Sequence, residues 1–266
     1  MSTAGRRVSV VVGGASGLGL ATARLLAASG DLVVVGDVDG DGAKRAAAEL
    51  PDQGGEPDVG HQGVAVDVTD EAAVEALFAD VTARHGAPHG VVNCAGVSTL
   101  SPVVDHDAGE WRRVVDVCLT GSFLVLKHAG RHVADGGSLV TLSSLNARQP
   151  GTGLAAYCAA KAGVVALTEV TALELGPRRV RVNAVAPGLV VTPLTAPAMD
   201  IPGVRDEYVA NTPLGRPGRP EEIAAACRFL LSDEAAWITG ETLDINGGAH
   251  LQRYPDLMDL VTKAFA

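Results

Sequence analysis

Two residues with complementary acid–base chemistry lie four positions apart in the sequence. Tyr157 and Lys161 fall in a segment of helical composition, so their side chains would share one helical face. A free phenol has a pKa of about 10 and is a weak base near neutrality, but an adjacent ammonium favours the phenolate. Ser144, thirteen residues before Tyr157 and at the end of a predicted strand, would hold a substrate oxygen beside the phenol. These three side chains predict proton transfer to or from an alcohol oxygen.

A glycine-rich turn directly follows the first predicted strand. It reads Gly13-Gly14-Ala15-Ser16-Gly17-Leu18-Gly19, and a helix is predicted to begin within it. A dinucleotide pyrophosphate needs backbone N–H groups at a helix N-terminus with no side chains in between, which Gly13, Gly17 and Gly19 would provide. The strand before the turn and the helix after it make this motif more specific than the glycines alone.

Asp37 ends the second predicted strand, eighteen residues after Gly19. A carboxylate at this position accepts hydrogen bonds from both hydroxyls of the adenosine ribose and repels a 2′-phosphate. The sequence therefore favours NAD over NADP. The positive charge of oxidised nicotinamide would act with Lys161 to favour the phenolate of Tyr157.

The elements that must position these residues alternate along the chain. Apolar runs predict buried parallel strands at residues 7–12, 32–36, 64–67, 90–93, 138–143, 180–184 and 242–245. Helical segments are predicted at residues 18–28, 42–50, 71–84, 109–133, 155–175 and 220–231. Two loops, residues 51–63 and 187–219, interrupt the alternation. The pattern predicts an α/β fold: a single Rossmann-like, doubly wound parallel sheet of about seven strands, flanked by helices on both faces.

The composition excludes several kinds of partner. A formal net charge of −10 would repel nucleic acid and anionic membrane surfaces. The four cysteines lack the paired short spacing of a metal knuckle or a disulfide framework, and we expect no metal site. The apolar run near the N-terminus is too short for a signal peptide or a membrane span. We therefore expect a cytoplasmic protein.

Further motifs agree with the glycine turn and with Tyr157-Cys158-Ala159-Ala160-Lys161 in order and spacing. They are Asp67-Val68, Asn93-Cys94-Ala95-Gly96, Arg181-Val182-Asn183 with Pro187-Gly188, and Asp244-Ile245-Asn246-Gly247-Gly248. With these motifs, residues 6–248 resemble the short-chain dehydrogenase/reductase family in its compact form.

The resemblance implies hydride transfer between nicotinamide and a secondary alcohol or ketone, with Ser144, Tyr157 and Lys161 as catalytic residues. The cofactor residues that it implies are Gly13, Ser16, Gly17, Leu18, Gly19, Asp37, Asp67, Val68, Asn93, Ala95, Gly96, Tyr157, Lys161, Pro187, Gly188, Val190 and Thr192. It also implies a homotetramer or homodimer, with the helices from Gly109 and Ala155 at its interfaces.

Two positions depart from the family pattern. Val12 replaces the usual Thr before the first glycine, which removes a hydroxyl that ties the turn to the neighbouring strand. Cys118 replaces a catalytic Asn that, in the family, anchors a water linking the lysine to solvent. Because a thiol is a poorer hydrogen-bonding partner than an amide, we expect a slower or rerouted proton relay.

We expect a catalytic domain over residues 1–248, with a substrate lid at about residues 189–215. A C-terminal extension, residues 249–266, has an apolar side that we expect to dock on a neighbouring subunit. The predicted substrate is a hydrophobic or cyclic small molecule. Two alternatives remain open: an NADPH-dependent ketoreductase of acyl or polyketide type, and a nucleotide-binding regulatory protein with weak catalysis.

Overall fold

The computed structural model describes residues 6–51 and 60–265. Its centre is a parallel sheet of seven strands in the order β3-β2-β1-β4-β5-β6-β7. The strands are β1 (Val8–Val12), β2 (Leu32–Asp37), β3 (Gln62–Ala65), β4 (Gly90–Asn93), β5 (Ser138–Leu142), β6 (Arg181–Pro187) and β7 (Thr242–Ile245). The strand order reverses between β1 and β4, as in doubly wound folds. The predicted fold class is confirmed.

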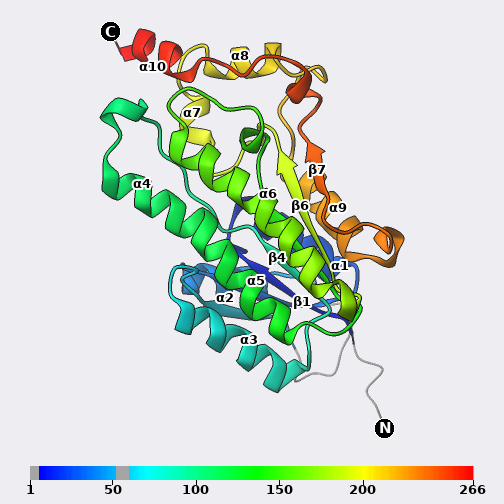
Figure 1. Ribbon diagram of the computed structural model, residues 1–266. Coiled ribbons are helices and arrows are strands. Elements are labelled where there is room, and N and C mark those ends of the chain that lie inside the picture. The colour runs from blue at the N-terminus through cyan, green and yellow to red at the C-terminus, as the bar shows by residue number, and fades with distance from the viewer. Residues whose placement is uncertain (1–5, 52–59, 266) are drawn as a thin grey trace.

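Helices cover both faces of the sheet (Figure 1). In β1, Val10 and Val12 face a core shared with α3 (Glu71–His85), α5 (Gly121–His132) and α6 (Ala155–Leu175). Val11 faces the opposite core, shared with α1 (Gly17–Ala28), α2 (Gly40–Ala48) and α9 (Pro220–Leu231). Successive side chains of a strand point to opposite faces, so β1, which is apolar except for the buried Ser9, buries both.

The predicted helix over residues 109–133 is interrupted. The structure has α4 (Ala108–Val115), a π-helical turn (Asp116–Thr120) and then α5. The apolar periodicity continues through the turn, so the sequence pattern does not mark it. Such turns often occur at functional sites, and this one contains Cys118.

Two predicted boundaries were wrong near β3. The strand begins at Gln62, two residues before the predicted start, because it pairs with Val34–Asp37 of β2. Gly63 was assigned to a loop, but a Cβ there would lie 2.4 Å from the backbone of Ala43, so glycine permits the close approach of α2. The rest of the predicted loop, residues 52–59, lies outside the described residues.

The second predicted loop, residues 187–219, contains two short helices, α7 (Ala196–Met199) and α8 (Val204–Ala210). The C-terminal extension ends in α10 (Leu257–Phe265). Figure 1 shows α7, α8 and α10 together at one end of the molecule, beyond the carboxyl ends of the strands. They form a cap over the edge of the sheet at which α/β proteins bind their ligands.

One helix in the described part of the chain, Ala155–Arg178, is long and apolar enough to cross a membrane by length and composition alone. It includes α6, which packs along β6 and beside the π-helical turn. Tyr157 and Lys161 lie in its first turns. The helix is therefore part of the α/β domain.

Candidate active site

A cavity of about 750 Å³ opens at the carboxyl ends of β1, β2 and β4, where the strand order reverses. Ligands bind at this position in doubly wound sheets. The predicted cofactor residues that line it are Gly13, Ser16, Gly17, Leu18, Gly19, Asp37, Asp67, Val68, Ala95, Gly96 and Thr192. The same cavity is lined by three residues that were not predicted from the sequence, Arg112 and Arg113 of α4 and Asp116 of the π-helical turn. No motif marked them.

The glycine turn has the geometry of an anion cradle. Gly13 has a φ of +74°, and a Cβ on it would lie 2.6 Å from the Ala95 nitrogen. A Cβ on Gly19 would lie 2.0 Å from the Gly13 oxygen. The first turn of α1 contains no acidic residue, and the Ser16 side chain makes no capping hydrogen bond. The first N–H groups of α1 are thus available to a phosphate, and the turn fits a dinucleotide.

Backbone contacts replace the hydroxyl that Val12 lacks. The Gly13 and Gly14 nitrogens donate to the Gly36 oxygen at 2.8 and 3.1 Å. The Val12 oxygen accepts from the Cys94 nitrogen at 2.8 Å. These bonds tie the turn to both neighbouring strands, so valine at this position leaves the cradle intact.

Asp37 is held at the rim of the cavity by backbone donors. Its Oδ2 accepts from the Ala15 nitrogen at 2.9 Å, and its Oδ1 accepts from the Asp39 nitrogen at 3.0 Å. Because each carboxylate oxygen has two lone pairs, both can still accept hydrogen bonds from a ribose. Arg45 lies close by but pairs with Asp39 at 3.6 Å.

Asn93, Pro187, Gly188 and Val190 support the site without lining this cavity. The buried Asn93 accepts from the Ala95 nitrogen at 3.2 Å and donates to Ser122 Oγ at 3.0 Å. Pro187 pairs with Ile245 at the end of β6, and a Cβ on Gly188 would lie 2.8 Å from Asn246 Cβ. Val190 is buried in the core. They form part of the framework around the site, and their contact with the cofactor stays a prediction.

Ser144, Tyr157 and Lys161 converge behind the cavity. Ser144 lies near the Tyr157 phenol and opposes part of the rise in its pKa, while its hydroxyl donates to Asn146 Oδ1 at 3.4 Å. Lys161 Nζ lies 5.6 Å from the centre of the Tyr157 ring and donates to the Leu142 oxygen at 2.6 Å. Burial raises the pKa of Tyr157 and lowers the pKa of Lys161, because desolvation penalises both charged forms. The fold thus unites the three residues that the sequence singled out.

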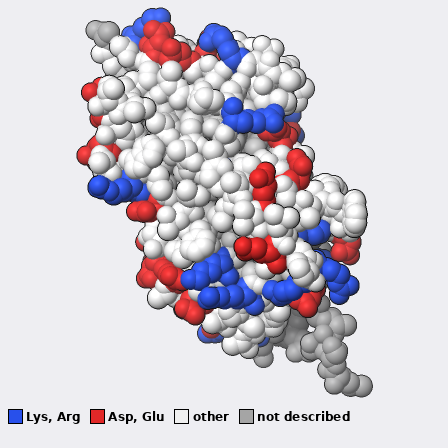
Figure 2. Space-filling model, in the orientation of Figure 1, with Lys and Arg blue, Asp and Glu red and all other residues white. Residues whose placement is uncertain are grey.

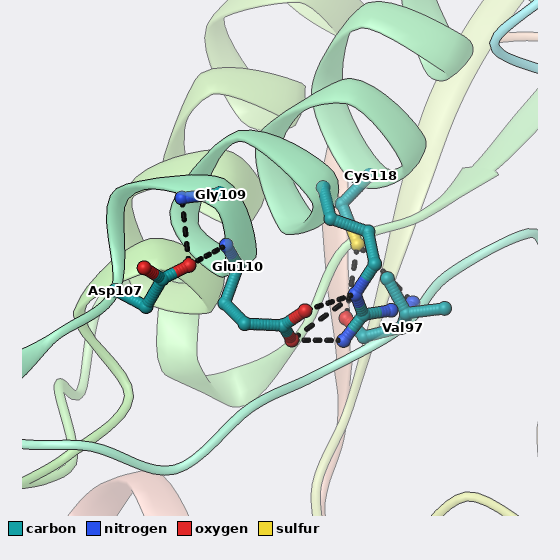
Figure 3. Close-up of polar contacts among 6 residues, drawn as sticks. Val97, Asp107, Gly109, Glu110 and Cys118 are labelled. Atoms are coloured by element: carbon teal, nitrogen blue, oxygen red, sulfur yellow. Dashed lines mark hydrogen bonds and ion pairs between the residues drawn. The ribbon is translucent and has the colours of Figure 1, made fainter.

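Cys118 lies in the π-helical turn and contacts the loop after β4 (Figure 3). Its Sγ donates to the Val97 oxygen at 3.2 Å and accepts from the Val97 nitrogen at 3.4 Å. Its carbonyl oxygen accepts from Ser122 Oγ at 2.7 Å, and Ser122 in turn binds Asn93. The thiol therefore holds the π-helical turn against the loop after β4, a structural role that the residue type alone did not predict.

Figure 3 also shows how α4 begins. Asp107 Oδ1 accepts from the Gly109 and Glu110 nitrogens at 2.8 and 2.9 Å, which caps the helix. Glu110 pairs with Arg113 at 2.9 Å. Arg113 thus lines the cavity with its positive charge balanced by the carboxylate of Glu110.

The cap brings further side chains to Ser144. Asn146, Tyr208 of α8 and Tyr254 of the C-terminal extension form a hydrogen-bonded group next to it. The apolar side of the extension packs on its own chain, where Leu257 joins Val204 of α8 and Leu154 in a buried cluster. Docking of the extension on a neighbouring subunit stays a prediction. Within the described residues, no group of three His, Cys, Asp or Glu side chains could hold a metal ion.

Comparisons with known proteins agree with this geometry. Residues 13–250 match a family model described as enoyl-(acyl carrier protein) reductase. A short-chain type dehydrogenase/reductase from Mycobacterium ulcerans superposes with a TM-score of 0.91 at 36% identity, covering 97% of this chain and 95% of that one. The fold and site define a nucleotide-binding oxidoreductase. The chain belongs to the short-chain dehydrogenase/reductase family, whose dehydrogenases use NAD(P).

Two characterised relatives span nearly the whole chain. Cis-4-hydroxycyclohexanecarboxylate dehydrogenase of Sinomonas cyclohexanicum is 43% identical over 248 residues, which cover 91% of this chain and 96% of the relative. 3beta-hydroxysteroid dehydrogenase 1 of Eggerthella lenta is 38% identical over 250 residues, covering 92% and 94%. Both are dehydrogenases of ring-borne hydroxyl groups by name.

Proposed function

We propose that this enzyme is an NAD-dependent dehydrogenase that interconverts a secondary alcohol on a hydrophobic or alicyclic ring and the corresponding ketone. The observation that carries the proposal is the convergence of Ser144, Tyr157 and Lys161 beside a cavity built for a dinucleotide. The ring-borne hydroxyl in the names of the two relatives supports the substrate class.

In the oxidation direction, Ser144 orients the alcohol oxygen and Tyr157 takes its proton. Lys161 favours the phenolate through its charge and holds its place by donating to Leu142. The glycine turn and Asp37 would hold the nicotinamide cofactor, which would supply the hydride acceptor for oxidation or the hydride donor for reduction. Substrate loses one proton and one hydride, so the products are the ketone, protonated Tyr157 and the reduced cofactor.

Asp37 supports a preference for NAD. Its carboxylate is fixed by the Ala15 and Asp39 nitrogens at the position where an adenosine ribose would bind. A 2′-phosphate there would meet a negative charge, and the nearby Arg45 is already paired. Ribose hydroxyls, in contrast, would donate to that charge.

A second candidate is an NADPH-dependent ketoreductase of acyl substrates. Arg112 lines the cavity and would attract an extra phosphate, and the matching family model has an acyl-carrier name. A regulatory protein with weak catalysis is disfavoured, because the three catalytic side chains are all present and in contact.

We further propose that residues 1–248 form the catalytic domain, with residues 189–215 as its lid and 249–266 as an extension. The enzyme would act in the cytoplasm as a homotetramer or homodimer, on a small molecule rather than on nucleic acid or a membrane. The four free cysteines suit a reducing compartment.

Calorimetric titration of NADH and NADPH into the purified protein tests the cofactor, and NADH absorbance across a panel of cyclic alcohols tests the reaction. We expect tighter binding of NADH, together with turnover of at least one alicyclic alcohol. Tighter NADPH binding that is lost in Arg112→Ala would establish the second candidate instead. Cofactor binding without turnover of any alcohol, ketone or acyl substrate would contradict both.

A further inference from the structure

Carboxylates outnumber free cations along the wall of the cofactor cavity. Asp37, Asp67 and Asp116 line it, and hydrogen bonds from Thr69 lower the pKa of Asp67. A dinucleotide adds a negative charge on each phosphate of its pyrophosphate, and like charges within one cavity repel each other. The formal charge of −10 on the chain opposes the same ligand. Binding therefore gains from a cation that can approach the pyrophosphate.

The glycine turn offsets only part of this charge. Residues 13–19 contain no Lys or Arg, so the turn offers backbone N–H groups and the dipole of α1. A helix N-terminus carries roughly half an elementary positive charge, which is less than the negative charge of a pyrophosphate. The start of the lid lies against the turn, because a Cβ on Gly17 would lie 3.4 Å from Thr192 Cβ, and residues 192–194 are uncharged. A full positive charge must therefore come from another element.

Two cations line the cavity within the described residues, and both lie in α4. The first, Arg113, is occupied: its Nη2 and Nε donate to Glu110 Oε2 at 2.9 and 3.1 Å. The second is Arg112, whose side chain forms no hydrogen bond and no ion pair with any residue that the structure describes. Asp116, four positions further along the chain, does not pair with it. Arg112 thus lines the cavity with an unpaired positive charge.

The packing of α4 keeps Arg112 at this wall. Val114 is buried against Ala156 and Ala160 of α6, which fixes one face of α4. Gly109 and Arg112, three positions apart on the helix, both line the cavity. Arg112 is exposed, and an arginine side chain has many rotamers, so it can turn towards an anion within the same cavity.

We propose that Arg112 is a cofactor-binding residue whose guanidinium binds the pyrophosphate held at the glycine turn. Its planar fork of donors matches a pair of phosphate oxygens. NADH and NADPH share the pyrophosphate, so Arg112 serves both and leaves the choice between them to Asp37. This inference rests on the dinucleotide cavity of the proposed function. It gives α4 a part in cofactor binding that no motif in the sequence marked.

Substitutions matched in charge test the proposal by calorimetry. Arg112→Gln should raise the Kd of NADH by about tenfold, the scale of one charge-assisted contact to a phosphate. Arg112→Lys should raise it less, by about threefold, because an ammonium keeps the charge but lacks the fork. The control is Arg24→Gln in α1, which changes the net charge equally, has a side chain that is 53% exposed and lies outside the cavity. It should leave the Kd within about twofold of wild type, because salt screens a distant charge.

Cofactor fragments locate the contact and need no turnover. ADP-ribose keeps the pyrophosphate and lacks nicotinamide, so its Kd should rise in Arg112→Gln by the same factor as that of NADH. The Kd of NADPH should rise by this factor too. Adenosine has no phosphate, and its inhibition constant against NADH binding should not change. The difference between variant and wild type should shrink as ionic strength rises from about 0.05 to about 0.5 M, because salt screens exposed charges.

An unchanged Kd of NADH in Arg112→Gln would overturn the inference. A loss confined to NADPH would overturn it as well, since Arg112 would then bind a 2′-phosphate. An equal loss for adenosine would do the same, because the contact would then lie on the base or its ribose. A wild type that binds none of NADH, NADPH and ADP-ribose would contradict the proposed function and this inference together. Tight NADH binding that is unaffected in Arg112→Gln would contradict this inference alone.

Discussion

At the scale of single residues, the site places two groups where neither charged form is favoured by its surroundings. Burial raises the pKa of the Tyr157 phenol and lowers that of the Lys161 ammonium. The chemistry nevertheless needs a phenolate and a cation. The nearby Ser144 side chain lowers the pKa of the phenol in part, and a hydrogen bond from Lys161 to the Leu142 oxygen offsets part of the cost of burying the ammonium. Loss of solvent is thus the largest influence on the pKa of both residues.

This arrangement predicts the pH dependence of a Lys161→Met variant. In the proposed reaction the phenolate of Tyr157 is the active form in alcohol oxidation, so the rate should rise as pH passes the pKa of Tyr157 in the cofactor complex. Loss of the ammonium removes a charge that favours the phenolate, which raises that pKa and moves the midpoint of the profile to higher pH. The kcat at pH 7 should fall by about a hundredfold or more. Steady-state profiles from pH 6 to about pH 11 check this shift, and a variant with an unshifted midpoint would refute the tuning role.

Cys118→Asn is expected to preserve or raise turnover. The thiol already donates to and accepts from the Val97 backbone, and an amide can make both bonds more strongly. Cys118→Val, of similar size but without these bonds, is the control and should lower both stability and kcat, the former by about 1–2 kcal/mol. Kinetics and thermal unfolding of the two variants decide the matter. A large loss of turnover in a folded Cys118→Asn protein would show that the thiol itself is required.

At the scale of elements, the parts that repeat a simple pattern could be predicted from the sequence. The strands that bury both faces, such as β1, read as continuous apolar runs, and the glycine turn has a spacing that few other structures need. The π-helical turn could not be predicted, because it changes hydrogen bonding and leaves the apolar periodicity unbroken. For the same reason the sequence showed Cys118 only as a departure from the family pattern. It did not indicate that the thiol holds the π-helical turn in place.

The sequence also could not predict that Asn146, Tyr208 and Tyr254 form a hydrogen-bonded group. These residues are separated by 46 to 108 positions, and nothing local in a sequence records which loops meet. Asp37 and the residues of α6 were predictable because one strand end or one helix face places them. The cap is assembled by contacts between its own helices, so its polar partners follow only from the fold.

Deletion of residues 253–266 tests the cap as an element. It removes Leu257 from the buried cluster with Val204 and Leu154, and it removes the partner of Glu207. We expect KM for the alcohol to rise by about tenfold and kcat to fall, because a loosened lid no longer holds the substrate. NADH affinity should change little, since the extension does not line the cofactor cavity. Unchanged KM and kcat would mean that the extension contributes to neither substrate binding nor turnover.

At the scale of the whole molecule, charge and apolar surface are segregated. The chain carries a formal charge of −10, yet Figure 2 shows a broad area of uncharged side chains on the face with α4, α5 and α6, with charged groups mostly towards its rim. Phe123 of α5 and Val170 and Leu173 of α6 are 46%, 50% and 79% exposed. Apolar side chains concentrated on two neighbouring helices are typical of an interface between identical subunits.

The double variant Val170→Glu/Leu173→Glu should therefore reduce the oligomer to a smaller species. In a two-fold interface each substitution acts twice, and burying four carboxylates without partners costs far more than the apolar contact contributes, about 1.5–3 kcal/mol per side chain. Val104→Glu is the control, because Val104 is 91% exposed and lies outside these helices. Light scattering after size exclusion should show the control at the wild-type mass and the double variant at a lower one. A double variant of unchanged mass would show that the interface lies elsewhere. A wild type that is already monomeric would show that there is no such interface. If the interface forms as expected, the partner subunit would support α6 from outside, and the first turns of this helix carry Tyr157 and Lys161. The smaller species should therefore have lower activity than the wild type while keeping the same secondary structure.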